Sequence, residues 1–338
     1  MSDDNGIDGG IARTTRGRTA RGAAVALASV LLVGGTIAAT TVGRNSPEPE
    51  RDAPTGDRGD AADACRDTLP MPAADHHMHV WNEEGRDALV RLLGELRAGE
   101  PPAIPTFDGD QVAARLDSAG IDRGVLLSNA YLYGSPDVRF DDEYGQVRAQ
   151  NDWVAGEAAR HPDRLVAFFG VNPLADYAGT EVERCAEVSA CLGIKLHFAN
   201  SDVDLHDPEH VRRLRSVFAR ADARGLAIAV HLRTRREEFG EMEVEIFIDR
   251  VASAAPHVPI QVAHMGGSSG FDAATQRLFM AFAAQLEAHP ERTRNIIFDM
   301  ALVPMLLDAG RGGAAARERI ETMNRRFAEA VRTVGPDR

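Results

Sequence analysis

The chain has 338 residues and a formal net charge of −13, so it is long enough for one large domain or two smaller ones. The acidic balance excludes nucleic acid as an expected partner, because a protein that binds DNA or RNA needs a basic surface.

The sequence of residues 1–44 is typical of a targeting segment. Four arginines between residues 13 and 21 precede an uncharged, mostly apolar run from Ala23 to Val42. A helix of this length can cross the hydrocarbon core of a bilayer, which is roughly 30 Å thick. The same run can be the core of a cleaved signal peptide. We therefore expect an extracytoplasmic protein, either secreted or anchored to the membrane through residues 22–42.

Residues 45–69 are rich in Pro, Asp, Glu, Gly and Ala and have almost no large apolar side chains. Such a composition cannot offset the entropy lost on ordering, so it predicts a disordered acidic linker. The folded domain is expected to span residues 70–338.

Short apolar runs alternate with helical patterns through this domain. The expected strands are Ala73–Val80, Gly124–Ser128, Leu165–Val171, Leu192–Phe198, Leu226–Leu232, Pro259–His264 and Asn295–Met300. The expected helices are Glu143–Arg160, Glu181–Ala190, Pro208–Ala223, Glu243–Ala254, Ala274–Ala288 and Ala314–Val334. The clearest is Pro208–Ala223, with Asp207 as N-cap, proline at its first position and Gly225 just beyond its end. The alternation predicts an α/β fold with a parallel sheet, and no Gly-x-Gly-x-x-Gly follows the first strand, so we favour a (β/α)8 TIM barrel over an open sheet.

An eighth strand is missing from this pattern. The printed sequence reaches Val334–Arg338 where that strand should start. A barrel of seven strands has two unpaired edges, which natural proteins avoid. We expect either a C-terminally truncated product or a partner chain that covers the gap, and we favour truncation.

Histidines and the only lysine of the chain gather at the predicted strand ends. They are His77, His79, Lys195, His197, His231 and His264. In a barrel the C-terminal strand ends form the functional face. His77 and His79 alternate on one strand and so share a face, and imidazole is a common ligand of zinc. In a chain whose other Lys and Arg positions are all arginine, Lys195 indicates chemistry that needs a neutral amine. The set predicts a metal site.

These motifs resemble the amidohydrolase superfamily, in its amidohydrolase-related, decarboxylase-like branch ("amidohydrolase 2"). The resemblance rests on Asp75-x-His77-x-His79, Gly193–Phe198, the strand that ends at His231, and Gln261-Val262-Ala263-His264. It implies that His77, His79, His231 and His264 bind one or two divalent ions, with zinc expected, and that Lys195 is carboxylated and bridges two of them. It also implies an aspartate after an eighth strand, which the printed sequence lacks. Asp299 on the seventh strand is expected to support the site or the fold instead.

The resemblance implies a hydrolase that uses metal-activated water to cleave an amide, ester or lactone of a small molecule. Lys195 favours hydrolysis because a bridging carbamate needs two ions. The alternatives are a metal-dependent decarboxylase of a small carboxylic acid and an inactive remnant that only binds ligands. The oligomeric state and the substrate are not predicted.

Several other residues have weaker assignments. Arg233, Arg235 and Arg236 could clamp an acidic substrate group, although a solvated turn is the favoured interpretation. Trp81, Tyr131 and Tyr133 are candidates for lining the pocket. Cys185 and Cys191 could form a disulfide in an oxidising compartment, which would leave Cys65 unpaired.

Overall fold

The structure is a computed structural model, and it describes residues 73–96, 103–236, 238–268, 270–301, 303 and 314–335. Within these residues seven strands form one parallel sheet whose spatial order follows the chain. The strands are β1 (Ala74–Val80), β2 (Arg123–Ser128), β3 (Leu165–Gly170), β4 (Cys191–His197), β5 (Ala227–His231), β6 (Ile260–Val262) and β7 (Ile296–Phe298). Every strand expected from the sequence is present.

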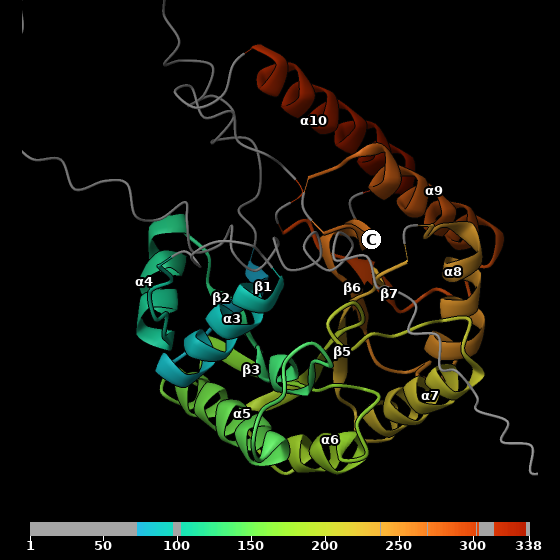
Figure 1. The fold of residues 1–338 in the computed structure, drawn as a ribbon. Coiled ribbons are helices and arrows are strands. Elements are labelled where there is room, and N and C mark those ends of the chain that lie inside the picture. Colours follow the sequence, from blue (N-terminus) through green and yellow to red (C-terminus); the bar gives the residue numbers. More distant parts are fainter. Residues whose placement is uncertain are drawn as a thin grey trace, which may run out of the picture.

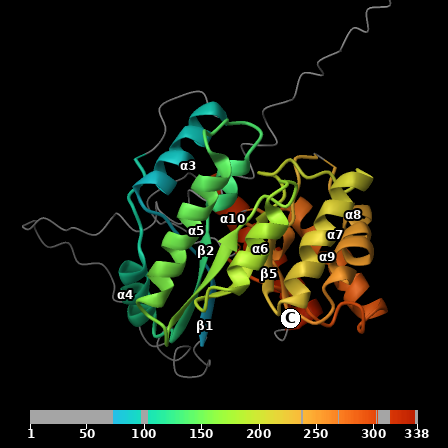
Figure 2. The same cartoon turned by 90° about the horizontal axis from the view of Figure 1, so that it is seen from below.

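Helices alternate with the strands and cover the outside of the curled sheet (Figure 1). They are α3 (Glu83–Leu96), α4 (Gly109–Ala119), α5 (Glu143–Ala159), α6 (Ala178–Ala186), α7 (Pro208–Ala223), α8 (Glu241–Ile246), α9 (Ala273–Ala288) and α10 (Ala314–Val334). Figure 2 shows α5, α6 and α7 beside the strands. The architecture is that of a TIM barrel with seven strands in the described part of the chain, as predicted.

The sheet curls until its two edges approach each other. In the described residues β1 and β7 are the edge strands and do not pair with one another. Side chains nevertheless join the two edges, because His77 Nδ1 lies 2.8 Å from Asp299 Oδ2. Gln261 Nε2 also donates to the carbonyl of His76, at 3.3 Å. The residues just beyond β7 are therefore close to the C-terminal half of β1.

The main core lies between the sheet and the surrounding helices. It includes Leu126, Phe169, Leu196, Phe218 and Phe247, all of which are fully buried. Inside the curl, near the strand starts, a cavity of about 580 Å3 is lined by residues such as Val166, Leu192 and Ala227. The packed core thus supports the strands from outside and fixes the positions of the strand ends.

Helix α7 begins and ends where the sequence predicts. Asp207 accepts a hydrogen bond from the backbone N–H of Glu209, and Pro208 occupies the first turn. Gly225 follows the helix with a φ of +67°, a left-handed conformation that costs glycine little. The cap residues therefore set both ends of this helix.

The predicted strand Pro259–His264 is shorter in the structure. Strand β6 ends at Val262, and a 3-10 turn follows over Ala263–Gly266. His264 and Met265 have φ values of +54° and +52°, which are unusual for residues with a side chain and turn the chain out of the sheet. The position of His264 is thus set by this turn and not by the strand.

Other boundaries also differ from the predictions. The expected single helix Glu243–Ala254 is α8 followed by a π-helical turn, Phe247–Val251, and a 3-10 turn, Ala252–Ala254. Helix α6 begins three residues earlier than expected and ends at Ala186. Two helices between β1 and β2 had no predicted bounds, and one of them, α3, packs its leucines on the segment after β2.

Cys185 at the end of α6 and Cys191 at the start of β4 form a disulfide, with their Cα atoms 5.5 Å apart. The pairing that the sequence left open is therefore present. The predicted targeting segment, the linker and Cys65 lie outside the described residues. None of the described helices is long and apolar enough to cross a membrane.

Candidate metal centre

The paired histidines of β1 lie side by side in the interior. Both side chains are buried, and His77 Nε2 lies 3.3 Å from His79 Nε2. Two imidazole nitrogens bound tetrahedrally to one zinc ion, at about 2.0–2.1 Å each, would lie roughly 3.3–3.4 Å apart. The spacing of these two nitrogen atoms therefore fits a shared ion.

Hydrogen bonds at the opposite ring nitrogens determine which atoms are free for an ion. His79 Nδ1 lies 3.1 Å from the carbonyl oxygen of Leu127, and His264 Nδ1 lies 2.7 Å from that of Ala301. His77 Nδ1 faces a carboxylate oxygen of Asp299. Since these oxygens only accept, each Nδ1 carries the proton, and each Nε2 of a neutral ring keeps its lone pair. This is the tautomer that metal-ligating histidines adopt when their second nitrogen is held by an oxygen.

Asp299 follows β7 and ties three parts of the centre together. Its Oδ2 atom accepts from His77 Nδ1 and from Gln261 Nε2, at 2.8 and 2.6 Å. Its Oδ1 atom accepts from the backbone N–H groups of His264 and Ala301, at 2.9 and 3.1 Å. Burial would raise the pKa of Asp299, but the neighbouring histidines and these hydrogen bonds hold it well below its usual range. Asp299 is thus an ionised group at the centre.

The described residues contain one group of three side chains able to hold a divalent ion. His77, His264 and Asp299 offer ligand atoms that all lie within 4.8 Å of one another. The sequence analysis expected a supporting role for Asp299, and its hydrogen bond to His77 gives it that role, while its oxygens also lie within reach of an ion. The chain therefore has a divalent-metal site at the C-terminal strand ends.

The other side of the centre is built by neighbouring strands. Lys195 and His197 lie two residues apart on β4, and His197 is in register with His231 on β5. The rings of His197 and His231 are stacked, with centroids 4.0 Å apart, and the ring of His231 lies 5.4 Å from that of His264. Parallel strands thus place side chains that are far apart in sequence against each other, as predicted.

Burial controls the charge of these groups. It lowers the pKa of Lys195 to about 8, although the carboxylate of Asp299 opposes the shift. Burial, together with repulsion from His77, lowers the pKa of His264 to about 3. The pKa values of His197 and His231 are also held well below the ordinary value by burial. These rings are consequently neutral near pH 7 and can offer lone pairs.

Several polar atoms here have no hydrogen-bond partner among the described residues. They are Lys195 Nζ, His197 Nε2 and both ring nitrogens of His231. Leaving buried polar atoms unpaired costs free energy, so their grouping indicates that something else binds them. A divalent cation suits the unpaired nitrogens of His231, because neutral imidazole is one of its usual ligands.

The predicted aromatic residues are only partly at the site. The ring of Tyr131 lies 5.2 Å from that of His197. Trp81 instead donates its indole N–H to the carbonyl of Pro105. Tyr133 packs against Phe140. Tyr131 alone of the three is therefore placed against the centre by the contacts in the described part of the chain.

The arginines after β5 have separate partners. Both Nη atoms of Arg235 pair with the carboxylate of Asp137, and Arg236 lies 3.5 Å from Asp204. Arg233 is half-buried. Because Arg235 and Arg236 already bind carboxylates, they join loops of this face and are poor candidates for clamping a substrate.

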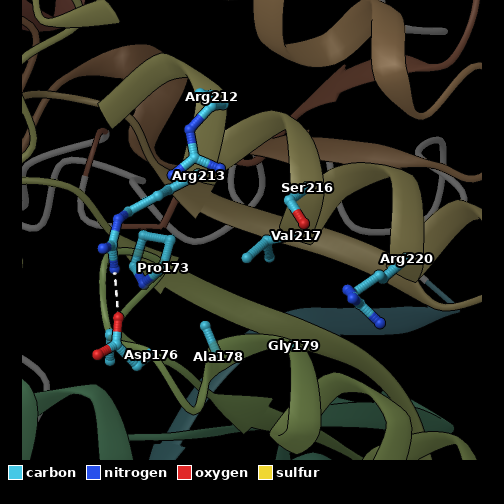
Figure 3. A pocket seen from close by; sticks show the side chains of 10 residues that line it. Pro173, Asp176, Ala178, Gly179, Arg212, Arg213, Ser216, Val217 and Arg220 are labelled. Carbon is cyan, nitrogen blue, oxygen red and sulfur yellow. Dashed lines mark hydrogen bonds and ion pairs between the residues drawn. The ribbon is translucent and has the colours of Figure 1, made fainter. Parts of the chain in front are cut away.

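A second hollow, of about 240 Å3, lies between α6 and α7 (Figure 3). Its arginines are paired with carboxylates, since Arg213 lies 2.8 Å from Asp176 and Arg212 binds Glu209. None of the residues of the metal centre lines it. It is a surface hollow that is separate from the centre.

The sequence analysis named Asp299 as a supporting group but missed the other groups that orient the histidines. Carbonyl groups of Leu127 and Ala301 carry no side-chain signal, so they could not be found from the sequence. Gln261 and Asp299 do have a signal, because both lie on or just after strands whose ends were expected to form the functional face. The contact of Asp299 with His77 depends on how far the sheet curls, because β1 and β7 do not pair, and the sequence pattern does not give that curl.

Comparisons with known proteins agree with the sequence resemblance. A family model described as amidohydrolase, of the amidohydrolase 2 type, matches residues 74–338. No curated protein matches the chain. The chain is similar to the solved structure of 5-carboxyvanillate decarboxylase from Sphingomonas paucimobilis, with 17% identity, a TM-score of 0.46, and coverage of 79% of this chain and 86% of that chain.

Two further solved structures are similar over comparable lengths. A protein described as a 2-pyrone-4,6-dicarboxylic acid hydrolase from Acinetobacter baumannii has 13% identity and a TM-score of 0.40, with coverage of 77% of this chain and 92% of that chain. A 5-carboxyvanillate decarboxylase from Novosphingobium aromaticivorans, in complex with manganese, has 15% identity and a TM-score of 0.41, with coverage of 67% and 78%.

Proposed function

The chain belongs to the amidohydrolase 2 family, and on that premise we propose that it is a metal-dependent hydrolase of a small molecule. The observation that carries the proposal is the distance of 3.3 Å between the Nε2 atoms of His77 and His79, both of which have their Nδ1 atoms bound to oxygen. Two buried lone pairs directed at the same space are repulsive without a cation. The site is thus prepared for an ion.

We propose zinc as the ion, held by His77, His79, His231 and His264. Imidazole ligands suit zinc, and all four rings are buried at the same end of the sheet. When bound, such an ion lowers the pKa of water and polarises a scissile carbonyl. Asp299 holds His77 in the tautomer that leaves Nε2 free, and the carbonyl of Ala301 does the same for His264. The chain thereby fixes its ligands before any ion binds.

Lys195 is proposed to be carboxylated and to bridge two ions. Carbamate formation needs a neutral amine, and burial lowers the pKa of Lys195 to about 8, so a substantial fraction is neutral near that pH. Its Nζ atom has no partner among the described residues, and its side chain is 1% exposed. A carbamate there would supply the two oxygens that a pair of ions needs. This bridge is the reason for favouring hydrolysis.

A metal-dependent decarboxylase is the second candidate. The unpaired donor at Lys195 Nζ, deep among the histidines, suits the carboxylate of an acidic substrate. In that reaction the bond from carbon to the carboxylate breaks, CO2 leaves, and a proton takes its place on carbon. A mononuclear centre without a carbamate would favour this reaction.

The test is elemental analysis of the purified full chain, beside Lys195→Arg and Arg233→Ala. We expect about two equivalents of zinc in the parent, about one in Lys195→Arg and about two in Arg233→Ala. Equal metal content in Lys195→Arg and the parent would rule out the bridge. One equivalent in the parent favours the decarboxylase, which is then assayed by CO2 release against proton release from ester and lactone panels and amine release from an amide panel.

Absence of metal in a folded parent would contradict both proposed enzyme activities and leave the alternative of an inactive protein that only binds ligands. Circular dichroism of each preparation shows whether the chain is folded, so that loss of metal is not mistaken for loss of structure. The permanently charged guanidinium of Lys195→Arg can itself disturb a buried site, so Lys195→Met serves as a second, uncharged variant with the same expected loss.

We also propose that the protein is exported, with the N-terminal apolar run as a signal peptide or anchor. The disulfide between Cys185 and Cys191 supports an oxidising compartment, because cytosolic thiols are kept reduced. The substrate is accordingly a small molecule found outside the cytoplasm. The acidic balance of the chain argues against a nucleic-acid partner.

A further inference from the structure

His197 belongs to the histidine cluster, but neither the family resemblance nor the proposed ligand set gives it a role. It ends β4, and its side chain is 2% exposed. Its ring is stacked on that of His231, with centroids 4.0 Å apart, and lies 5.2 Å from that of Tyr131. A buried ring packed against two other rings has little freedom to turn. Its two nitrogens are thus fixed in place.

The backbone determines which nitrogen of His197 carries the proton. The N–H group of Asn200 donates to His197 Nδ1 at 3.2 Å, so this atom must present a lone pair. An imidazole that accepts at one nitrogen carries no proton there, so the ring is the neutral form. A neutral ring that accepts at Nδ1 carries its proton on Nε2.

This arrangement is the reverse of that in the ligand histidines. His77, His79 and His264 each have Nδ1 beside an oxygen acceptor and keep the lone pair on Nε2. His197 has no lone pair on Nε2 and so cannot bind an ion through that atom. Its Nε2–H group is buried and has no acceptor among the described residues. The unpaired atom is therefore a hydrogen-bond donor beside the metal centre.

We propose that His197 donates its Nε2–H to an anionic oxygen of the substrate, a carboxylate or the oxyanion formed during hydrolysis, and is not a metal ligand. The inference rests on the proposed function, because it assumes that His231 holds an ion. The ring of His197 is stacked on that of His231, so if His231 held an ion, a substrate carboxylate bound there would lie beside His197 and could accept its Nε2–H. A hydrogen bond from a neutral donor to an anion is stronger than one between neutral groups.

Two substitutions at position 197 distinguish the roles of the two ring nitrogens. Asparagine at position 197 places an amide oxygen near the Nδ1 position and can still accept from Asn200, but it has no group at the Nε2 position. Glutamine can place an amide N–H near the Nε2 position. His197→Asn thus removes the proposed donor, and His197→Gln restores it.

The experiment titrates the full chain and both variants with Co2+, and then adds acetate as the carboxylate probe while the visible spectrum of the bound cobalt is recorded. We expect all three proteins to bind the same number of ions with the same spectrum before acetate. The acetate dissociation constant should rise about tenfold or more in His197→Asn, the size expected for loss of a hydrogen bond to a charged group, and return towards the parent value in His197→Gln.

The outcomes distinguish this inference from the proposed function. If the parent binds no Co2+, the proposed metal centre itself fails, and this inference fails with it. If the parent binds Co2+ but His197→Asn binds fewer ions, His197 is a ligand or supports the lysine carbamate, and only the inference is overturned. It is also overturned if the parent does not bind acetate, or if the three acetate constants are equal.

A second measurement needs no variant. In zinc-loaded protein labelled with 15N-histidine, we expect NMR to show His197 with a proton on Nε2 and none on Nδ1. A metal-bound Nε2 would contradict the proposal. This readout remains decisive if the substituted proteins fail to fold.

Discussion

At the scale of single residues, the centre is defined by hydrogen bonds that fix protons. Hydrogen bonds with four groups outside the imidazoles determine which ring nitrogens carry a lone pair. These groups belong to Asp299, Leu127, Ala301 and Asn200. Three of these groups belong to the backbone: Leu127 lies on β2, and Asn200 and Ala301 follow β4 and β7. The chemistry of the histidines thus depends on main-chain geometry as much as on their own positions.

Asp299→Asn should weaken metal binding without removing any histidine. The amide has one oxygen where the carboxylate had two, and it lacks the charge that favours the hydrogen bond with His77 Nδ1. Loss of such a supporting group typically lowers metal affinity about 10- to 100-fold. Competition with a chelator of known affinity measures the change. Asp163→Asn, at an exposed carboxylate, is the matched control, and an unchanged zinc affinity in Asp299→Asn would contradict the role assigned to Asp299.

At the scale of elements, the parts that could be predicted are those with local signals. Asp207, Pro208 and Gly225 mark the ends of α7, and both ends are where the sequence placed them. The predicted end of β6 was wrong by two residues, because His264 takes a left-handed backbone conformation that its contact with Asp299 stabilises. Strand ends near the centre are therefore set by long-range hydrogen bonds, which an apolar run does not encode.

The link between α6 and β4 carries a prediction about stability and compartment. Cys185 and Cys191 close a loop with a sequence separation of 6. Chain-entropy arguments for so short a loop give a stabilisation of roughly 2 kcal/mol. Replacing both cysteines with alanine should lower the free energy of unfolding by about that amount, measured with urea under non-reducing conditions.

Thiol counting provides the control for this prediction. If the disulfide forms, denatured full chain should react with one equivalent of alkylating agent before reduction, at Cys65, and three after it. A Cys65→Ala variant should react with none before reduction and two after it. Three reactive thiols in the unreduced parent would contradict the disulfide.

At the scale of the whole molecule, the curled sheet brings neutral histidines together in one buried region. The pKa values of His79, His197, His231 and His264 are all lowered, chiefly by burial. Their positions on β1, β4, β5 and the turn after β6 mean that the sheet must stay curled for them to remain together. Stability and metal binding are thus linked through the same side chains, and the pH should affect both.

The unfolding free energy of the metal-free chain should fall as the pH drops below about 6.5, the ordinary pKa of histidine. Below that pH the histidines of the unfolded chain bind protons, whereas the buried rings of the folded chain stay neutral, so the unfolded state is favoured. Each such histidine contributes a slope of about 1.4 kcal/mol per pH unit once the unfolded form is fully protonated. For His264 this range extends down to its folded pKa of about 3. Stability should be fully present above pH 6.5 and lost progressively on acidification.

Urea unfolding of the metal-free protein between pH 7.5 and 5.5 measures this slope. His264→Gln removes one titrating group and should make the slope shallower by about 1.4 kcal/mol per pH unit at the acidic end. His289→Gln, at an exposed histidine, should leave the slope unchanged. A stability that is flat across this range would mean that the rings are protonated as easily in the folded chain as in the unfolded one. They would then lack the lone pairs on which the metal centre depends.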